Sequence, residues 1–126
     1  MNFKKAKKKA GKVAEDRERM MDLIHSVIEK MKKTEDRNEL LKAAREKIAT
    51  LTRMLKAYAS GDYKTIPWKS LVLIVAGLIY FVNPLDLIPD FIPMIGLMDD
   101  LALLFWIFNS VNNDIEEYQA WKKASR

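Results

Sequence analysis

A first stripe of apolar residues falls within residues 13–33 and has the period of a helix. Its members recur at intervals of four, three and four, with two neighbours that widen the stripe: Met20, Ile24, Val27 and Met31, with Leu23 and Ile28 beside them. This spacing predicts an amphipathic helix with one face toward a core. Residues 1–12 are rich in lysine, and we expect them to be frayed or loosely helical.

A second stripe predicts a second helix of similar length. Asp36 and Glu39 have the spacing of a capping box at its start, and Gly61 suits a left-handed cap at its end. The apolar positions between these caps follow a heptad pattern: Leu41, Ala44, Ile48, Leu51, Leu55 and Tyr58. Two such helices joined by a short polar link indicate an antiparallel helical hairpin.

The second half of the chain has no such stripes, but two uncharged runs at residues 71–82 and 101–108. A helix that is apolar on every face is enclosed by protein or surrounded by lipid. Because a chain of 126 residues offers little protein with which to enclose a helix, we expect lipid. Extended to residues 66–85, the first run is about 30 Å long as a helix, which matches a hydrocarbon core. We therefore expect a transmembrane helix here.

The second run is a weaker candidate for a membrane span. Residues 101–111 give only about 16 Å of helix, and extending the run backwards takes in Asp99 and Asp100. Each carboxylate would cost about 2.5–3.5 kcal/mol at the middle of a bilayer. We therefore expect the second arm of this apolar hairpin to be shallow, tilted or re-entrant.

Between the two runs, prolines and aspartates alternate with apolar residues. The segment reads Asn83-Pro84-Leu85-Asp86-Leu87-Ile88-Pro89-Asp90-Phe91-Ile92-Pro93, followed by Ile95-Gly96-Leu97-Met98-Asp99-Asp100. With its flanks, residues 71–108, it resembles the YkvA-like domain of unknown function, a small bacterial membrane-associated module. Asn83 stands where a serine is common in that family. The resemblance implies a multi-helix membrane protein and brings neither an enzyme activity nor a ligand.

The simplest interpretation of this segment is a set of helix caps and breaks. Asn83 can cap a helix whose first residue is Pro84. Pro89 and Pro93 each remove a backbone donor and interrupt helix, so the chain turns. Gly96 gives the backbone freedom before the next helix, whose first turn would hold the last two aspartates. This interpretation accounts for every polar residue of the segment.

The alternative is that the four aspartates form a site. Asp86, Asp90, Asp99 and Asp100 could bind a hard cation such as Mg²⁺ or Ca²⁺ through carboxylate oxygens. They could also share protons in a niche of low dielectric constant. The spacing of a calcium-binding loop is absent from the sequence, so a cation or proton site remains the less favoured alternative.

Charge is divided unevenly along the chain. Residues 1–69 carry a net charge of +9 and residues 70–126 a net charge of −4, an asymmetry typical of contact with an anionic surface. Trp68 and Lys69 precede the apolar block, and Trp121 and Lys122 follow it, so we predict these four residues at the membrane interface. The same bias predicts both termini in the cytoplasm, and the family resemblance implies that the membrane is the bacterial inner (cytoplasmic) membrane. The lysine-rich start either binds anionic lipid or is a solvated face.

The remaining composition argues against chemistry. Without cysteine, the chain has no disulfide, no thiolate nucleophile and no cysteine-ligated zinc. His25 is the single histidine, and neither a glycine-rich phosphate loop nor a nucleophile motif is present. Lysine content without interleaved aromatic residues does not favour nucleic acid. We therefore expect no enzyme activity and no cofactor.

These patterns together predict an all-α fold with an N-terminal antiparallel helical hairpin, an apolar helical hairpin and a short C-terminal helix. The expected boundaries are 1–62 for the basic amphipathic hairpin, 63–69 for a linker, 70–111 for the YkvA-like apolar hairpin with its Pro/Asp-rich turn, and 112–126 for the polar C-terminal helix. The expected function is that of a non-enzymatic small membrane protein whose cytoplasmic helical surface contacts lipid or a protein partner. Met54 and Tyr58 are candidate positions for self-association. The alternative is a soluble all-α interaction domain with the apolar helices buried against the front hairpin.

Overall fold

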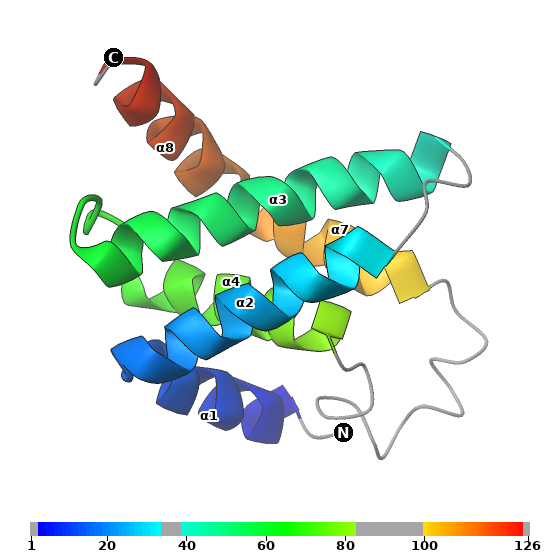
Figure 1. Cartoon of the computed structure of the whole chain (residues 1–126), viewed down its shortest axis with the longest axis horizontal. Helices are drawn as coiled ribbons and strands as arrows, with labels where there is room; N and C mark the ends of the chain where they lie inside the picture. Colours follow the sequence, from blue (N-terminus) through cyan, green and yellow to red (C-terminus); the bar gives the residue numbers. More distant parts are fainter. Residues whose placement is uncertain (1–2, 34–38, 83–99, 125–126) are drawn as a thin grey trace.

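The computed structural model describes residues 3–33, 39–82 and 100–124, and the regular structure in these ranges is entirely helical. Figure 1 shows its helices: α1 (Phe3–Ala14), α2 (Arg17–Lys33), α3 (Glu39–Ser60), α4 (Trp68–Val82), α7 (Asp100–Ser110) and α8 (Asn112–Ala124). The prediction of an all-α fold is confirmed.

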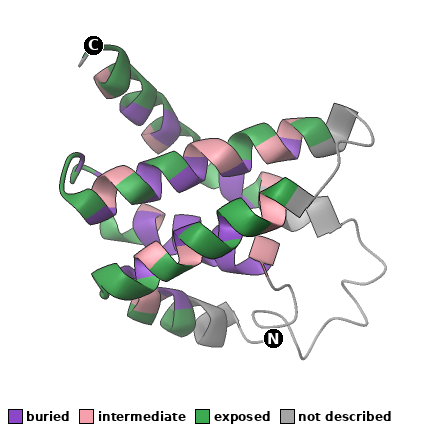
Figure 2. Ribbon diagram, viewed as in Figure 1, coloured by how far each residue is buried: buried purple, intermediate pink, exposed green. Residues whose placement is uncertain are grey.

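Helix α4 is the centre of the fold. Every residue from 71 to 80 is buried, and the helix packs against α1, α2, α3 and α7 (Figures 1 and 2). The expectation that a chain of this length cannot enclose an apolar helix is therefore wrong. The first 60 residues supply three covering helices where the sequence predicted two.

Helix α4 is also shorter than the span that the sequence suggested. It begins at Trp68 rather than at Ile66, and the carbonyl of Pro67 accepts a hydrogen bond from the Leu71 N–H at 2.9 Å. Its 15 residues correspond to about 22 Å of helix. Within the described ranges, no helix has both the length and the apolar character that crossing a membrane requires, so the predicted transmembrane helix finds no support there.

The lysine-rich start forms a helix of its own, α1, where we expected frayed or loosely helical chain. The predicted helix from Val13 onward is interrupted at Asp16, where α2 is capped. The Asp16 carboxylate accepts hydrogen bonds from the backbone N–H groups of Glu18 and Arg19 at 2.9 and 3.3 Å. An aspartate at this position satisfies donors that the first turn of a helix leaves unpaired.

In the part of α1 whose side chains are described, residues 8–14, the buried side chains are small. Ala10 and Ala14 are 0% and 4% exposed. A Cβ atom built on Gly11 would lie only 3.7 Å from the indole of Trp68. Such side chains allow a close approach of α1 and α4 but bury little apolar area. The two alanine methyl groups together contribute only about 1–2 kcal/mol of hydrophobic stabilisation.

Helices α2 and α3 present larger apolar residues to the core. The buried members of the predicted stripes are Met20, Ile24 and Val27 on α2, and Ala44, Ile48, Leu51 and Leu55 on α3. Two expectations are wrong: Ile28 is 39% exposed instead of widening the α2 stripe, and Met54 is 0% exposed instead of available for self-association. The guanidinium of Arg45 donates to the carbonyl of Met31 at 2.8 Å, which ties α3 to the end of α2.

Gly61 ends α3 in the left-handed conformation that the sequence predicted, with φ of 88°. Its N–H donates to the carbonyl of Tyr58 at 3.1 Å, and the N–H of Asp62 donates to that of Ala57 at 2.9 Å. These two hydrogen bonds form a Schellman motif, which satisfies the last carbonyls of the helix. The chain then turns back through residues 62–67 toward the start of α4.

Helices α7 and α8 complete the described fold. A Cβ atom on Gly77 would lie 3.4 Å from Ile107, so α4 and α7 pack closely at this point. The hydroxyl of Ser70, in the first turn of α4, donates to the Asp114 carboxylate of α8 at 2.5 Å. This hydrogen bond links the start of the central helix to the C-terminal helix.

Replacing Ile74 by alanine tests whether protein encloses α4. Ile74 is 0% exposed, so its truncation should lower the free energy of unfolding by about 2–5 kcal/mol through lost contacts and a residual cavity. The matched change Ile28→Ala, at a position 39% exposed, should cost less than about 1 kcal/mol. Urea unfolding in detergent-free buffer, followed by circular dichroism, measures both values. Equally small losses would contradict an enclosed α4.

Candidate functional site

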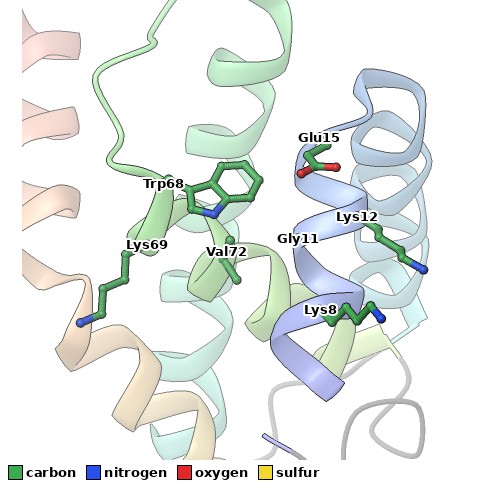
Figure 3. Close-up of a pocket in the computed structure, with 7 residues that line it drawn as sticks. All are labelled: Lys8, Gly11, Lys12, Glu15, Trp68, Lys69 and Val72. Carbon is green, nitrogen blue, oxygen red and sulfur yellow. The ribbon is translucent and has the colours of Figure 1, made fainter. Parts of the chain in front are cut away.

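The surface where α1 meets the start of α4 combines an exposed tryptophan with several cations. We call it the Trp68 face, and it surrounds an open hollow of about 580 Å³ (Figure 3). The hollow is lined by Lys8, Gly11, Lys12, Glu15, Trp68, Lys69 and Val72. Trp68 is 50% exposed, although so large an aromatic residue is ordinarily well buried.

The position of Trp68 in its helix explains this exposure. It is the first residue of α4 and follows Pro67, so its side chain emerges at the edge of the helix bundle. Val72, one turn further along the same face, is only 5% exposed. Gly11 has no side chain to fill the space beside the indole, and a Cβ atom there would already be in van der Waals contact. The ring therefore rests against α1 on one side and meets solvent on the other.

Positive charge dominates the Trp68 face. Lys8, Lys12 and Lys69 are exposed, and Glu15 is the single acid among the lining residues. In Figure 3 the Lys69 side chain extends to the opposite side of Trp68 from those of Lys8 and Lys12, so the ammonium groups diverge. Tight binding of one phosphate requires converging donors. Diverging cations around an aromatic ring suit an extended anionic surface instead.

The other two predicted interface residues, Trp121 and Lys122, lie on α8. Trp121 packs with its ring centroid 4.9 Å from that of Tyr63 and 5.8 Å from that of Tyr118. Tyr63 and Tyr118 also meet edge to face at 5.4 Å. The Trp121 ring is therefore partly buried and holds α8 against the chain that leads into α4, whereas Lys122 is exposed. Sequence patterns gave no indication of this aromatic cluster, because its members come from distant segments.

Burial raises the pKa of the Tyr118 phenol above its ordinary value of 10.0. The positive charge of Arg53 opposes this shift, and the neighbouring Tyr63 hydroxyl adds to it. Removal from water penalises the phenolate form, because a charge is poorly solvated among aromatic rings.

A further exposed aromatic residue, Trp106 on α7, was not anticipated from the sequence. It is 50% exposed and lines a second open hollow of about 450 Å³. The Lys47 ammonium lies 6.0 Å from the centroid of the neighbouring Phe108 ring. Trp106 stands within the uncharged run that we expected to form a shallow, tilted or re-entrant arm of the apolar hairpin. Such a run does not reveal which of its sides faces outward.

Most of the candidate cation or proton site lies outside the described residues. Three of its four aspartates fall there, together with the predicted capping and turn residues: Asp86, Asp90 and Asp99, with Asn83, Pro84, Pro89, Pro93 and Gly96. Asp100 is the first residue of α7. In the described part of the chain, no group of three or more acidic, histidine or cysteine side chains is placed to hold a metal ion. The capping and site interpretations therefore both stay predictions.

The region from α4 to α7 matches a known family. A family model described as a protein of unknown function (DUF1232) matches residues 70–106. Over 75 residues, the chain is 37% identical to the uncharacterized membrane protein YkvA of Bacillus subtilis (strain 168), and the alignment covers 60% of this chain and 71% of that protein. The chain belongs to the YkvA-like family. The predicted family resemblance is thus confirmed, and no solved structure matches this YkvA-like chain significantly.

The raised pKa of Tyr118 predicts a pH dependence of stability. Above pH 10.0 the unfolded chain releases the phenolic proton while the folded YkvA-like chain retains it. The unfolded state then binds fewer protons, so the free energy of unfolding should fall as the pH rises from 10.0 toward the pKa of the folded state. Urea titrations at successive pH values measure this slope. The slope should be shallower in Tyr118→Phe, and an unchanged slope would contradict the assignment to Tyr118.

Proposed function

We propose that this protein is a non-enzymatic, membrane-associated helical module that binds the anionic surface of the bacterial cytoplasmic membrane through the Trp68 face. The observation that carries the proposal is the half-exposed Trp68 with lysines on both of its sides. Tryptophan is enriched at membrane–water interfaces, where its ring contacts acyl chains and its N–H contacts water or headgroups. The relative from Bacillus subtilis, which is called a membrane protein, supports the proposal.

Electrostatic attraction would supply much of the binding free energy. A lysine held near an anionic leaflet contributes about 1 kcal/mol. Lys8, Lys12 and Lys69 line the Trp68 face, and α1 as a whole contains six lysines and no acid. The attraction decays within a Debye length of about 8 Å at physiological ionic strength. Cations that lie beside an inserted indole would remain within that distance of the headgroups.

The proposal places the protein on one side of the membrane. The cytoplasmic leaflet carries the negative surface potential that attracts basic segments. A chain docked there through the Trp68 face has both of its termini in the cytoplasm, as the charge distribution along the sequence predicts. The residues that line the face include no hydroxyl or thiol nucleophile beside a base, so we propose binding without catalysis.

Charge reversal at two positions of α1 tests the proposal. Lys8→Glu with Lys12→Glu should weaken binding to phosphatidylglycerol vesicles by about tenfold or more, because two attractive charges become repulsive. The matched control, Lys42→Glu with Lys56→Glu, makes the same change at two exposed lysines of α3, and it should weaken binding much less. Vesicle co-sedimentation at several salt concentrations measures the affinities. Equal losses in both variants would show attraction by net charge alone and contradict a specific face.

The contribution of the aromatic ring is tested separately. Trp68→Ala should also weaken binding to the same vesicles, but the dependence of binding on salt should stay as in the parent chain, since no cation is removed. Failure of the unaltered protein to sediment with anionic vesicles at low salt would refute the proposed function. If the protein fails to bind vesicles but proves to be a dimer by analytical ultracentrifugation, self-association would be favoured instead.

A further inference from the structure

We infer that α1 covers one face of α4 and can be displaced from it. An anionic bilayer displaces α1 and then contacts the apolar face of α4 that α1 had covered. This inference rests on the proposed function and concerns how the bilayer is bound. The occupant of the uncovered face is the bilayer itself, because the cover is cationic and the covered face is apolar.

The inner surface of α1 is described for residues 8–14, and the side chains on it are small. The buried ones in this stretch are Ala10 and Ala14, with Gly11 between them against the Trp68 indole and Val13 partly buried against the core. By contrast, α2 and α3 contribute buried isoleucine, leucine and methionine side chains, which remove several times more apolar area from water. Among the described side chains, displacement of α1 therefore sacrifices less hydrophobic contact than displacement of α2 or α3.

The outer surface of α1 favours the bilayer over water. Lys8 and Lys12 are four residues apart on one helix, and like charges at this spacing repel each other. An anionic surface reduces that repulsion and attracts the exposed lysines of the helix, Lys8, Lys9 and Lys12. A short helix with a cationic face and a small apolar face can lie in the plane of a membrane interface.

The face of α4 beneath α1 is apolar and, behind Trp68, is nearly but not fully buried. Trp68 and Val72 line the hollow beside α1, and Ala76 and Ile79 continue the same face by helical spacing. Val72, Ala76 and Ile79 are 5%, 7% and 7% exposed. The fully buried residues of α4, at 0% exposure, are Leu71, Ile74, Val75 and Leu78. With α1 displaced, Trp68 and the aliphatic side chains behind it would form one continuous apolar surface.

The connection between α1 and α2 permits the movement. The break at Asp16 separates the two helices, and the Asp16 carboxylate satisfies the first N–H groups of α2 at Glu18 and Arg19. The start of α2 is therefore capped by a residue outside α1. Rotation about residues 15 and 16 can swing α1 away while α2 stays packed on α3 and α4.

Thiol labelling tests the inference, because the natural chain contains no cysteine and a single introduced thiol is an unambiguous probe. Ala10→Cys places that thiol on the inner surface of α1, at a position 0% exposed. Vesicles of phosphatidylglycerol and phosphatidylcholine should accelerate its reaction with N-ethylmaleimide, a reagent that enters both water and bilayers, by about tenfold or more. Vesicles of phosphatidylcholine alone should leave the rate unchanged. Ala14→Cys, at a position 4% exposed, repeats the measurement if Ala10→Cys does not fold.

Ala44→Cys is the matched control, since Ala44 is 3% exposed on α3, away from the cover. Its reaction rate should not change with anionic vesicles. Vesicle-bound Ala10→Cys protein with an unchanged rate would overturn the inference while leaving the proposed function intact. Equal acceleration at positions 10 and 44 would mean that the bilayer unfolds the whole chain, and would also overturn it. Absence of vesicle binding would refute the proposed function and the inference together.

Discussion

The enclosure of α4 is the constraint on which the rest of the structure depends. Residues 71–80 are buried without interruption, so this helix has no polar side to turn toward water. A helix of that kind must be surrounded, and α1, α2, α3 and α7 pack around it. Three kinds of contact together cover α4: the large side chains of α2 and α3, the small ones of α1, and the close approach of α7 at Gly77.

Helix α1 has two different surfaces, one that packs on α4 and one that faces outward. Toward α4 it offers Ala10, Gly11 and Ala14, and toward the outside it offers lysine. The same division is suited to a folded cover and to an interfacial helix. In the proposed function, these two surfaces of α1 explain how a buried apolar helix and association with a membrane can belong to one protein. In aqueous solution α1 covers the apolar face of α4, and at the membrane the bilayer competes with α1 for contact with that face.

The parts of the fold that follow from local patterns were predictable. The α2 and α3 stripes and the Gly61 cap depend on residues close together in the sequence, and the structure confirms them for most of their described positions. Helix α1 was missed because alanine and glycine give little hydrophobic signal among lysines. The uniform run of α4 indicated that the helix must be surrounded, but it did not distinguish protein from lipid, and the expectation of lipid was wrong. At the candidate site, Trp68 and Lys69 were predicted from their place beside that run, whereas the contact between Trp68 and Gly11 depends on tertiary packing.

Hydrogen–deuterium exchange of the purified protein in detergent-free buffer tests the enclosure of α4 most directly. Amides of α4 should exchange most slowly of all described helices, through global unfolding alone, because protein surrounds them on every side. Amides of α1 should exchange faster, through local detachment. Rapid exchange of α4 in water, with protection only after lipid is added, would show that lipid rather than the chain's own helices encloses it, and would contradict this account.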